Sequence, residues 1–144
     1  MIRVIWANNV LRTESGEVLA HVRADVLEVG KERLLIESAV GVGLGFRMRA
    51  TSTRGKIFTL TKSSVSTRVL KANCHGRRYV VQRESWRSRR RIIVNAQGEK
   101  VGVVYPRGLK EVVLETNNSV PVIDQVFLSY GVAVVDTGAG NLRY

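Results

Sequence analysis

The chain has 144 residues with 44% hydrophobic residues and only two prolines, which fits one domain with its own core and excludes an intrinsically disordered chain. Cys74 is the only cysteine, so an intramolecular disulfide and a cysteine-rich metal site are excluded. The formal net charge of +11 favours an acidic partner, such as a lipid surface, a nucleic acid or an acidic protein.

Signals for tight turns recur at short, fairly even intervals along the chain. They are Ser15–Gly16, Gly30–Lys31, Arg54–Gly55, Lys62–Ser64, His75–Gly76, Gln97–Gly98, Arg107–Gly108 and Asn117–Asn118. Runs of alternating or β-branched residues lie between them. These runs are Val18–Val22, Ile57–Leu60, Tyr79–Val81, Ile92–Val94 and Val101–Val104. Strands at this spacing predict successive antiparallel hairpins in a sandwich or a barrel, within a single domain over residues 1–144.

The positive charge is concentrated in the middle of the chain. Between Leu44 and Arg107 there are 16 lysines and arginines, opposed only by Glu84 and Glu99, which gives a net charge of +14. The two flanking segments are slightly acidic, with net charges of −1 and −2. A concentrated basic field of this kind raises the local density of anionic partners.

The densest part of this basic region is a cluster of seven arginines within fifteen residues, with one tryptophan among them. Its members are Arg77, Arg78, Arg83, Trp86, Arg87, Arg89, Arg90 and Arg91. Guanidinium groups bind phosphate oxygens bidentately and stack on aromatic rings, so the cluster suits a phosphate-bearing ligand. A hairpin tip near Ser85–Ser88 would project it outward, and strand alternation would place Arg87, Arg89 and Arg91 on one face. The alternative is a solvated arginine-rich surface without a ligand.

The C-terminal stretch from Val120 to Val135 differs from the rest because it is apolar on nearly every helical face. Ser119 as the cap, Pro121 in the first turn and Gly138 as the stop predict a helix. A helix that is apolar all round is buried all round, which in so small a protein requires the inside of a barrel or a deep groove. The alternative is two more buried strands, broken at Gly131.

The segments Arg78–Val81, Ser85–Arg87, Ile92–Val104 and Val122–Val135 together resemble the tubby C-terminal-like superfamily, especially its LURF-one-related branch. The resemblance covers mainly residues 78–135. It implies a closed antiparallel barrel of about twelve strands threaded by a buried hydrophobic C-terminal helix. It also implies a non-enzymatic domain, whose relatives include phosphoinositide binders and scramblase-like membrane proteins. No family ligand motif matches residue by residue, so the resemblance assigns no functional residue.

No constellation of catalytic or metal-binding residues is legible in the sequence. Cys74 and His75 are adjacent, and adjacent strand residues point to opposite faces, so they make a poor nucleophile and base pair. His21 has no other ligand at zinc-site spacing. The glycines of Gly41–Gly45 lack the spacing of a nucleotide loop and favour a close approach of another element, such as the C-terminal helix. We therefore expect no enzymatic activity, no metal and no cofactor.

The location and partner follow from these observations. The first residues, Met1–Asn9, lack the apolar run of a signal peptide, and the Val120 to Val135 stretch is interrupted by Asp124 and too short to span a membrane. We expect a cytoplasmic protein, peripheral at the membrane, that binds anionic phospholipid headgroups through the arginine cluster. The alternative is a nucleic-acid-binding protein that uses the same basic surface.

Overall fold

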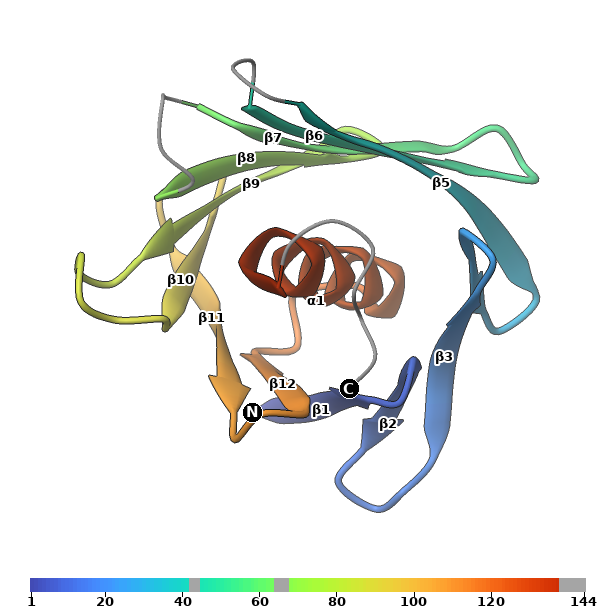
Figure 1. Cartoon of the computed structure of the whole chain (residues 1–144), viewed down its shortest axis with the longest axis horizontal. Coiled ribbons are helices and arrows are strands. Elements are labelled where there is room, and N and C mark those ends of the chain that lie inside the picture. Colours follow the sequence, from blue (N-terminus) through green and yellow to red (C-terminus); the bar gives the residue numbers. More distant parts are fainter. Residues whose placement is uncertain (42–44, 64–67, 138–144) are drawn as a thin grey trace.

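The structure is a computed structural model that describes residues 1–41, 45–63 and 68–137. For residues 39–41, 45 and 46 it describes the backbone alone. Twelve antiparallel strands of the described residues form a closed barrel, and one helix runs through its interior (Figure 1). This confirms the mainly β fold with a closed twelve-strand barrel and a buried C-terminal helix.

The strands follow one another around the barrel in chain order. They are β1 (Ile2–Ala7), β2 (Val10–Thr13), β3 (Val18–Arg23), β4 (Val26–Val29), β5 (Glu32–Gly41), β6 (Gly45–Ser52), β7 (Ile57–Lys62), β8 (Val69–Cys74), β9 (Arg77–Arg83), β10 (Arg91–Asn95), β11 (Lys100–Arg107) and β12 (Glu111–Thr116). Each strand pairs with the next, and β1 pairs with β12 in the register Ile2 to Thr116 and Trp6 to Val112. This last pairing closes the barrel and leaves no strand edge exposed.

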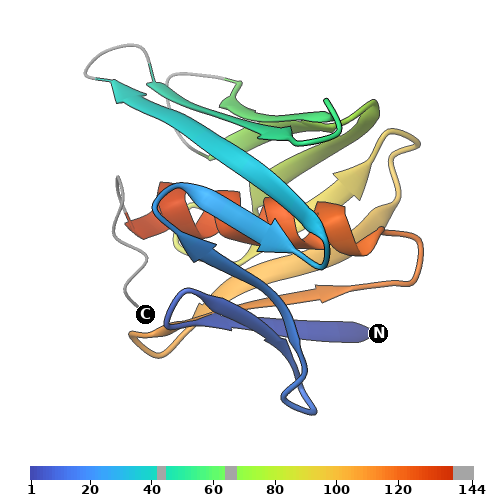
Figure 2. The same ribbon diagram turned by 90° about the vertical axis from the view of Figure 1, so that its right-hand side faces the viewer.

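The up-and-down topology sorts the turns onto two rims (Figure 2). Turns after odd-numbered strands form the odd rim, which includes Asn8–Asn9, Ala24–Asp25, 84–90 and 108–110. Turns after even-numbered strands form the even rim. Among the predicted turns, Gly16, Gly30, Gly55, Gly76, Gly98 and Gly108 all have positive φ, so each uses a backbone conformation that glycine adopts without strain. Ser64 of the predicted Lys62–Ser64 turn and residues 42–44 of the glycine-rich segment lie outside the described residues.

The helix α1 (Val122–Thr137) enters at the even rim and ends at the odd rim. It is the predicted C-terminal helix, and the alternative of two strands broken at Gly131 is wrong. Pro121 lies just before its first residue, and the Pro121 carbonyl accepts a hydrogen bond from the Gln125 N–H at 3.0 Å. Ser119 is not the cap, because the carbonyl that accepts this first helical hydrogen bond belongs to Pro121, two residues later, and the Ser119 hydroxyl donates instead to the Asn117 side chain. The predicted stop, Gly138, lies outside the described residues.

The barrel interior explains why α1 is apolar on every face. Phe127 is fully buried, and its ring lies 5.5 Å from that of Phe58 on β7. Burying one such side chain stabilises the fold by about 1.5–3 kcal/mol. Gly131 brings the helix close to the wall, since a Cβ there would lie 2.5 Å from the Leu60 Cδ2. The close approach expected at Gly41–Gly45 falls on a segment whose residues 42–44 lie outside the described residues.

Candidate functional site

The arginine cluster is divided by the barrel wall into an inward part and an outward part. Arg77 and Arg91 begin β9 and β10, and both direct their guanidinium groups toward α1. Residues 84–90 form the loop between the two strands, so strand alternation does not continue through it. The expectation that Arg87, Arg89 and Arg91 share one face is therefore wrong: Arg91 is fully buried, whereas Arg87 and Arg89 are exposed.

At the even rim, Arg77 holds the first turn of the helix through Asp124. The Arg77 Nε and Nη2 donate to the two Asp124 carboxylate oxygens at 2.7 and 2.8 Å. The Tyr79 hydroxyl donates to the same carboxylate at 2.6 Å. Burial raises the pKa of Tyr79, and its hydrogen bond to Asp124 raises this pKa further. The Asp124 side chain is fully buried, whereas that of Arg77 is 42% exposed.

At the odd rim, Arg91 holds the last turn of the helix through Asp136. The Arg91 Nη2 donates to Asp136 Oδ1 at 2.8 Å, and its Nε donates to Oδ2 at 3.2 Å. The Arg83 Nη2 lies 3.8 Å from the same carboxylate. A carboxylate in the last turn faces the negative end of the helix dipole, so these cations offset an unfavourable interaction. Arg77 and Arg91 therefore fasten both ends of the helix to the β9 and β10 wall.

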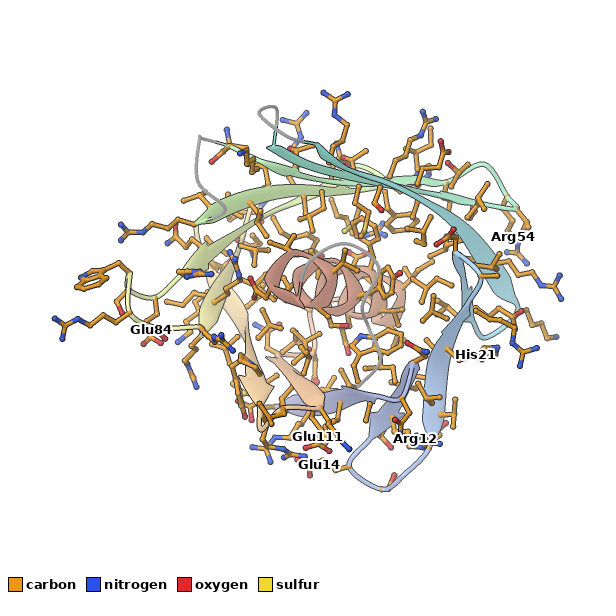
Figure 3. All side chains as sticks on the ribbon, viewed as in Figure 1. Arg12, Glu14, His21, Arg54, Glu84 and Glu111 are labelled. Carbon is orange, nitrogen blue, oxygen red and sulfur yellow. The ribbon has the colours of Figure 1, made fainter. Side chains whose placement is uncertain are left out.

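The loop of residues 84–90 carries the outward part of the cluster. The Ser88 N–H donates to the Ser85 carbonyl at 3.2 Å, which confirms the predicted tip at Ser85–Ser88. Trp86 at this tip is 71% exposed, and the Arg87 guanidinium carbon lies 4.6 Å from the Trp86 ring centroid. Figure 3 shows the loop projecting from the barrel beside Glu84, whose carboxylate lies 3.3 Å from the Arg90 Nε.

The neighbouring turn, between β11 and β12, adds a second exposed apolar tip. Leu109 is 88% exposed and Lys110 beside it is exposed. Arg89 and Leu109 line one small pocket, which shows that the loop and the turn are adjacent at the odd rim. The acid Glu111, labelled in Figure 3, accepts a hydrogen bond from Arg107 at 2.8 Å.

We call these exposed side chains the tip surface, which consists of Trp86, Arg87, Arg89, Leu109 and Lys110. Arg90 lies beside this surface. Its guanidinium group already makes a cation–π contact with Tyr105, because its guanidinium carbon is 5.3 Å from the Tyr105 ring centroid. Arg78 lies apart, because it is exposed near the start of β9 at the even rim. The arginines and Trp86 of this surface were predicted from the sequence, whereas Leu109 was not. The only sequence signal for Leu109 is that an apolar residue stands next to a predicted turn.

The candidate catalytic residues do not come together with one another. Cys74 is buried, whereas His75 is exposed in the turn that follows β8. The His21 Nε2 lies 2.9 Å from a Glu28 carboxylate oxygen on the adjacent strand. In the part of the chain that the structure describes, no three histidine, cysteine, aspartate or glutamate side chains are placed to hold a metal ion.

Cys74 should make the protein lose stability at alkaline pH. Burial, and then the Asp124 charge, raise the pKa of this thiol well above its ordinary value of 9.0. Because the folded pKa exceeds the unfolded one, this contribution is complete below pH 9.0 and declines as the pH rises toward the folded pKa. We expect a loss of up to about 1.4 kcal/mol per pH unit in urea unfolding between about pH 9 and pH 10. In Cys74→Val the free energy of unfolding should fall less steeply with pH over the same range. Equal slopes for this variant and the unaltered protein would contradict the prediction.

Comparison of the chain with protein-family models, with curated proteins and with solved structures found no significant match. Among the described residues, no helix combines the length and the apolar character that crossing a membrane requires.

Proposed function

We propose that this protein is a non-enzymatic cytoplasmic module that docks peripherally on anionic phospholipid surfaces through its tip surface. The observation that carries the proposal is the pairing of two highly exposed apolar tips, Trp86 and Leu109, with exposed basic side chains at one rim. The resemblance to the tubby-like superfamily points to the same class of ligand.

The two apolar tips suit insertion into the boundary between headgroups and acyl chains. These large apolar side chains are 71% and 88% exposed on two adjacent loops, and apolar surface gathered in this way marks a site of interaction with a protein or a membrane. Tryptophan favours the membrane interface, because its ring is apolar and its N–H remains hydrogen-bonded to water or headgroups. Leu109 gains free energy only from an apolar environment. It favours a lipid partner over a nucleic acid, whose backbone offers no comparable apolar partner.

The charges around the tips suit anionic headgroups. Arg87, Arg89 and Lys110 make no ion pair with any described residue, so nothing in the described part of the chain neutralises their positive charges. Each such charge near a surface of anionic lipids contributes about 1 kcal/mol. The nearby acids Glu84 and Glu111 are each paired with an arginine and oppose the field only weakly.

The test is co-sedimentation of the protein with vesicles of phosphatidylcholine alone and of phosphatidylcholine mixed with phosphatidylserine, at physiological salt. We expect binding to the anionic vesicles only. Arg87→Ser with Arg89→Ser should weaken it by roughly 25-fold, from two contributions of about 1 kcal/mol each. Trp86→Ser with Leu109→Ser should weaken it by at least about tenfold, because the inserted apolar area is lost.

The matched control is Arg47→Ser with Arg49→Ser, which removes the same charge from exposed positions on β6. If this variant weakens binding as much as Arg87→Ser with Arg89→Ser, only the overall charge matters and the tip surface is not the site. Adding RNA tests the alternative partner. Loss of vesicle binding in the presence of RNA, or no vesicle binding at all, would overturn the lipid proposal and favour a nucleic acid.

A further inference from the structure

A second basic surface lies on the outer wall of the barrel, where β6, β7, β8 and β9 run side by side (Figure 1). Met48, Leu60 and Ala72 are in register on three of these strands and are buried, so the residues on either side of each point outward. In Figure 3, nitrogen-tipped side chains project outward from this part of the barrel. The outward positions carry four exposed cations, which we call the wall face: Arg47, Arg49, Lys71 and Arg78.

The strand register arranges the wall face in two neighbouring rows across the sheet. The first row consists of Arg49, Thr59, Asn73 and Arg78, and the second of Arg47, Thr61 and Lys71. Because neighbouring strands are about 4.8 Å apart, the backbones of Arg49 and Arg78 are separated by about 14 Å. The cations are therefore spread over a rigid surface rather than gathered at one point.

The positive charge of the wall face is not offset by acids of its own strands. The sequences of β6, β7, β8 and β9 contain no aspartate or glutamate. None of the four cations makes an ion pair or a side-chain hydrogen bond with a described residue. On the adjacent strand β5, Glu37 is in register with Arg49. This surface is thus a part of the basic middle of the chain that neither the helix nor the tip surface uses.

The side chains between these cations are polar and suit phosphate oxygens. Thr59, Thr61 and Asn73 are half-buried on the wall face. The Asn73 Oδ1 accepts a hydrogen bond from the Gly76 N–H at 2.7 Å, which leaves the amide nitrogen as a donor. Guanidinium, ammonium, hydroxyl and amide groups are the ones that contact the phosphate backbone of nucleic acids.

We propose that the wall face binds the phosphate backbone of a nucleic-acid duplex without reading its sequence. The outward positions of the four strands carry no aromatic residue, so the base stacking on which single-strand binding relies is absent. A duplex carries about one negative charge per 1.7 Å of its axis, which complements cations spread over a rigid surface. The residues between the cations are polar, so this face offers no apolar tip for a lipid surface. The site is separate from the tip surface and does not depend on the proposed docking function.

The experiment is fluorescence anisotropy of a labelled duplex, as DNA and as RNA, titrated with the whole protein between about 50 and about 200 mM salt. We expect binding that does not change with the base sequence, and the tighter of the two duplexes identifies the kind of nucleic acid. One DNA strand alone and polyglutamate should both bind more weakly. If four cations contact phosphates, the logarithm of the association constant should fall against the logarithm of the salt concentration with a slope of about −3.6.

Arg47→Ser with Arg49→Ser should weaken duplex binding by at least about tenfold and make the slope shallower by about 1.8. Arg87→Ser with Arg89→Ser removes the same charge from the tip surface and should leave duplex binding and its slope unchanged. Both double variants replace exposed side chains, so both should fold. Only the second should lose vesicle binding, so failure of the docking function and failure of the wall face are distinguishable.

Three outcomes would overturn the wall-face proposal. One is that no duplex binds at about 50 mM salt. Another is that the two double variants bind the duplex equally well, since only the overall charge would then matter. The third is that the single strand or polyglutamate binds as tightly as the duplex, which would favour a single-stranded nucleic acid or an acidic protein.

Discussion

Replacing Arg77 by methionine should lower the free energy of unfolding by about 3 kcal/mol, at the lower end of the range for a broken buried ion pair. The variant leaves the Asp124 carboxylate fully buried, with the Tyr79 hydroxyl as its remaining side-chain donor. The lower end applies because Arg77 is 42% exposed, so its own desolvation in the folded state is incomplete. Urea unfolding monitored by tryptophan fluorescence measures the change.

Replacing the acidic partner, Asp124, should lower the free energy of unfolding by less. In Asp124→Leu the Arg77 guanidinium can turn toward water, and the main loss is the acceptor of the buried Tyr79 hydroxyl, which costs about 1–3 kcal/mol. The double variant should then be less destabilised than the sum of the two single variants. Arg78→Met is the matched control, because it removes the neighbouring exposed arginine and should change stability by no more than about 0.5 kcal/mol. Equal effects of Arg77→Met and Arg78→Met would contradict the structural role of Arg77.

These stability measurements also divide the arginine cluster by function. Arg77 and Arg91 contact carboxylates of the helix, so their replacement should reduce stability. Arg87 and Arg89 contact no carboxylate among the described residues, so their replacement should change vesicle binding and leave stability nearly unchanged. The proposed phosphate-binding set therefore centres on the loop arginines.

Much of the fold could be predicted because its signals are local. Glycines at the turns after β2, β4, β6, β8 and β10 mark where chains reverse, since positive φ is costly for other residues. The turns at Asn8–Asn9 and Ala24–Asp25 were missed. Both have positive φ without a glycine, and Ala24 gives no sequence signal for that conformation.

The helix could be predicted because its environment is unusual. A surface helix must keep one polar face, whereas α1 is surrounded by barrel strands and has no face in water. Its buried residues include Phe127, Leu128 and Ala133, which lie on different sides of the helix. The many valines of this segment favour a strand, but burial on all sides stabilises the helix more than strand propensity opposes it.

The division of the arginine cluster is only partly predictable, because it depends on contacts between residues more than forty positions apart. The sequence carries one signal for it. Asp124 and Asp136 are the two acids of a mostly apolar, buried helix, and buried carboxylates require cationic partners. The nearby arginine-rich strands were the obvious source of those partners.

Replacing Asp136 by alanine should lower the free energy of unfolding by about 3 kcal/mol. Arg91 is fully buried at the start of β10, and the change removes the carboxylate that accepts hydrogen bonds from two of its nitrogens. Glu111→Ala removes the carboxylate of an exposed ion pair with Arg107 and should cost no more than about 1 kcal/mol, which makes it the matched control.

A third variant separates the ion pair from the packing around it. Arg91→Met combined with Asp136→Leu replaces both charges by apolar side chains, so neither is left buried without its partner. This double variant should recover most of the stability that Asp136→Ala loses, because well-packed apolar residues often match a buried ion pair. Recovery would mean that the charges fix where the helix ends more than they stabilise the barrel. If the double variant is as unstable as Asp136→Ala, the pair itself provides net stability that apolar packing cannot replace.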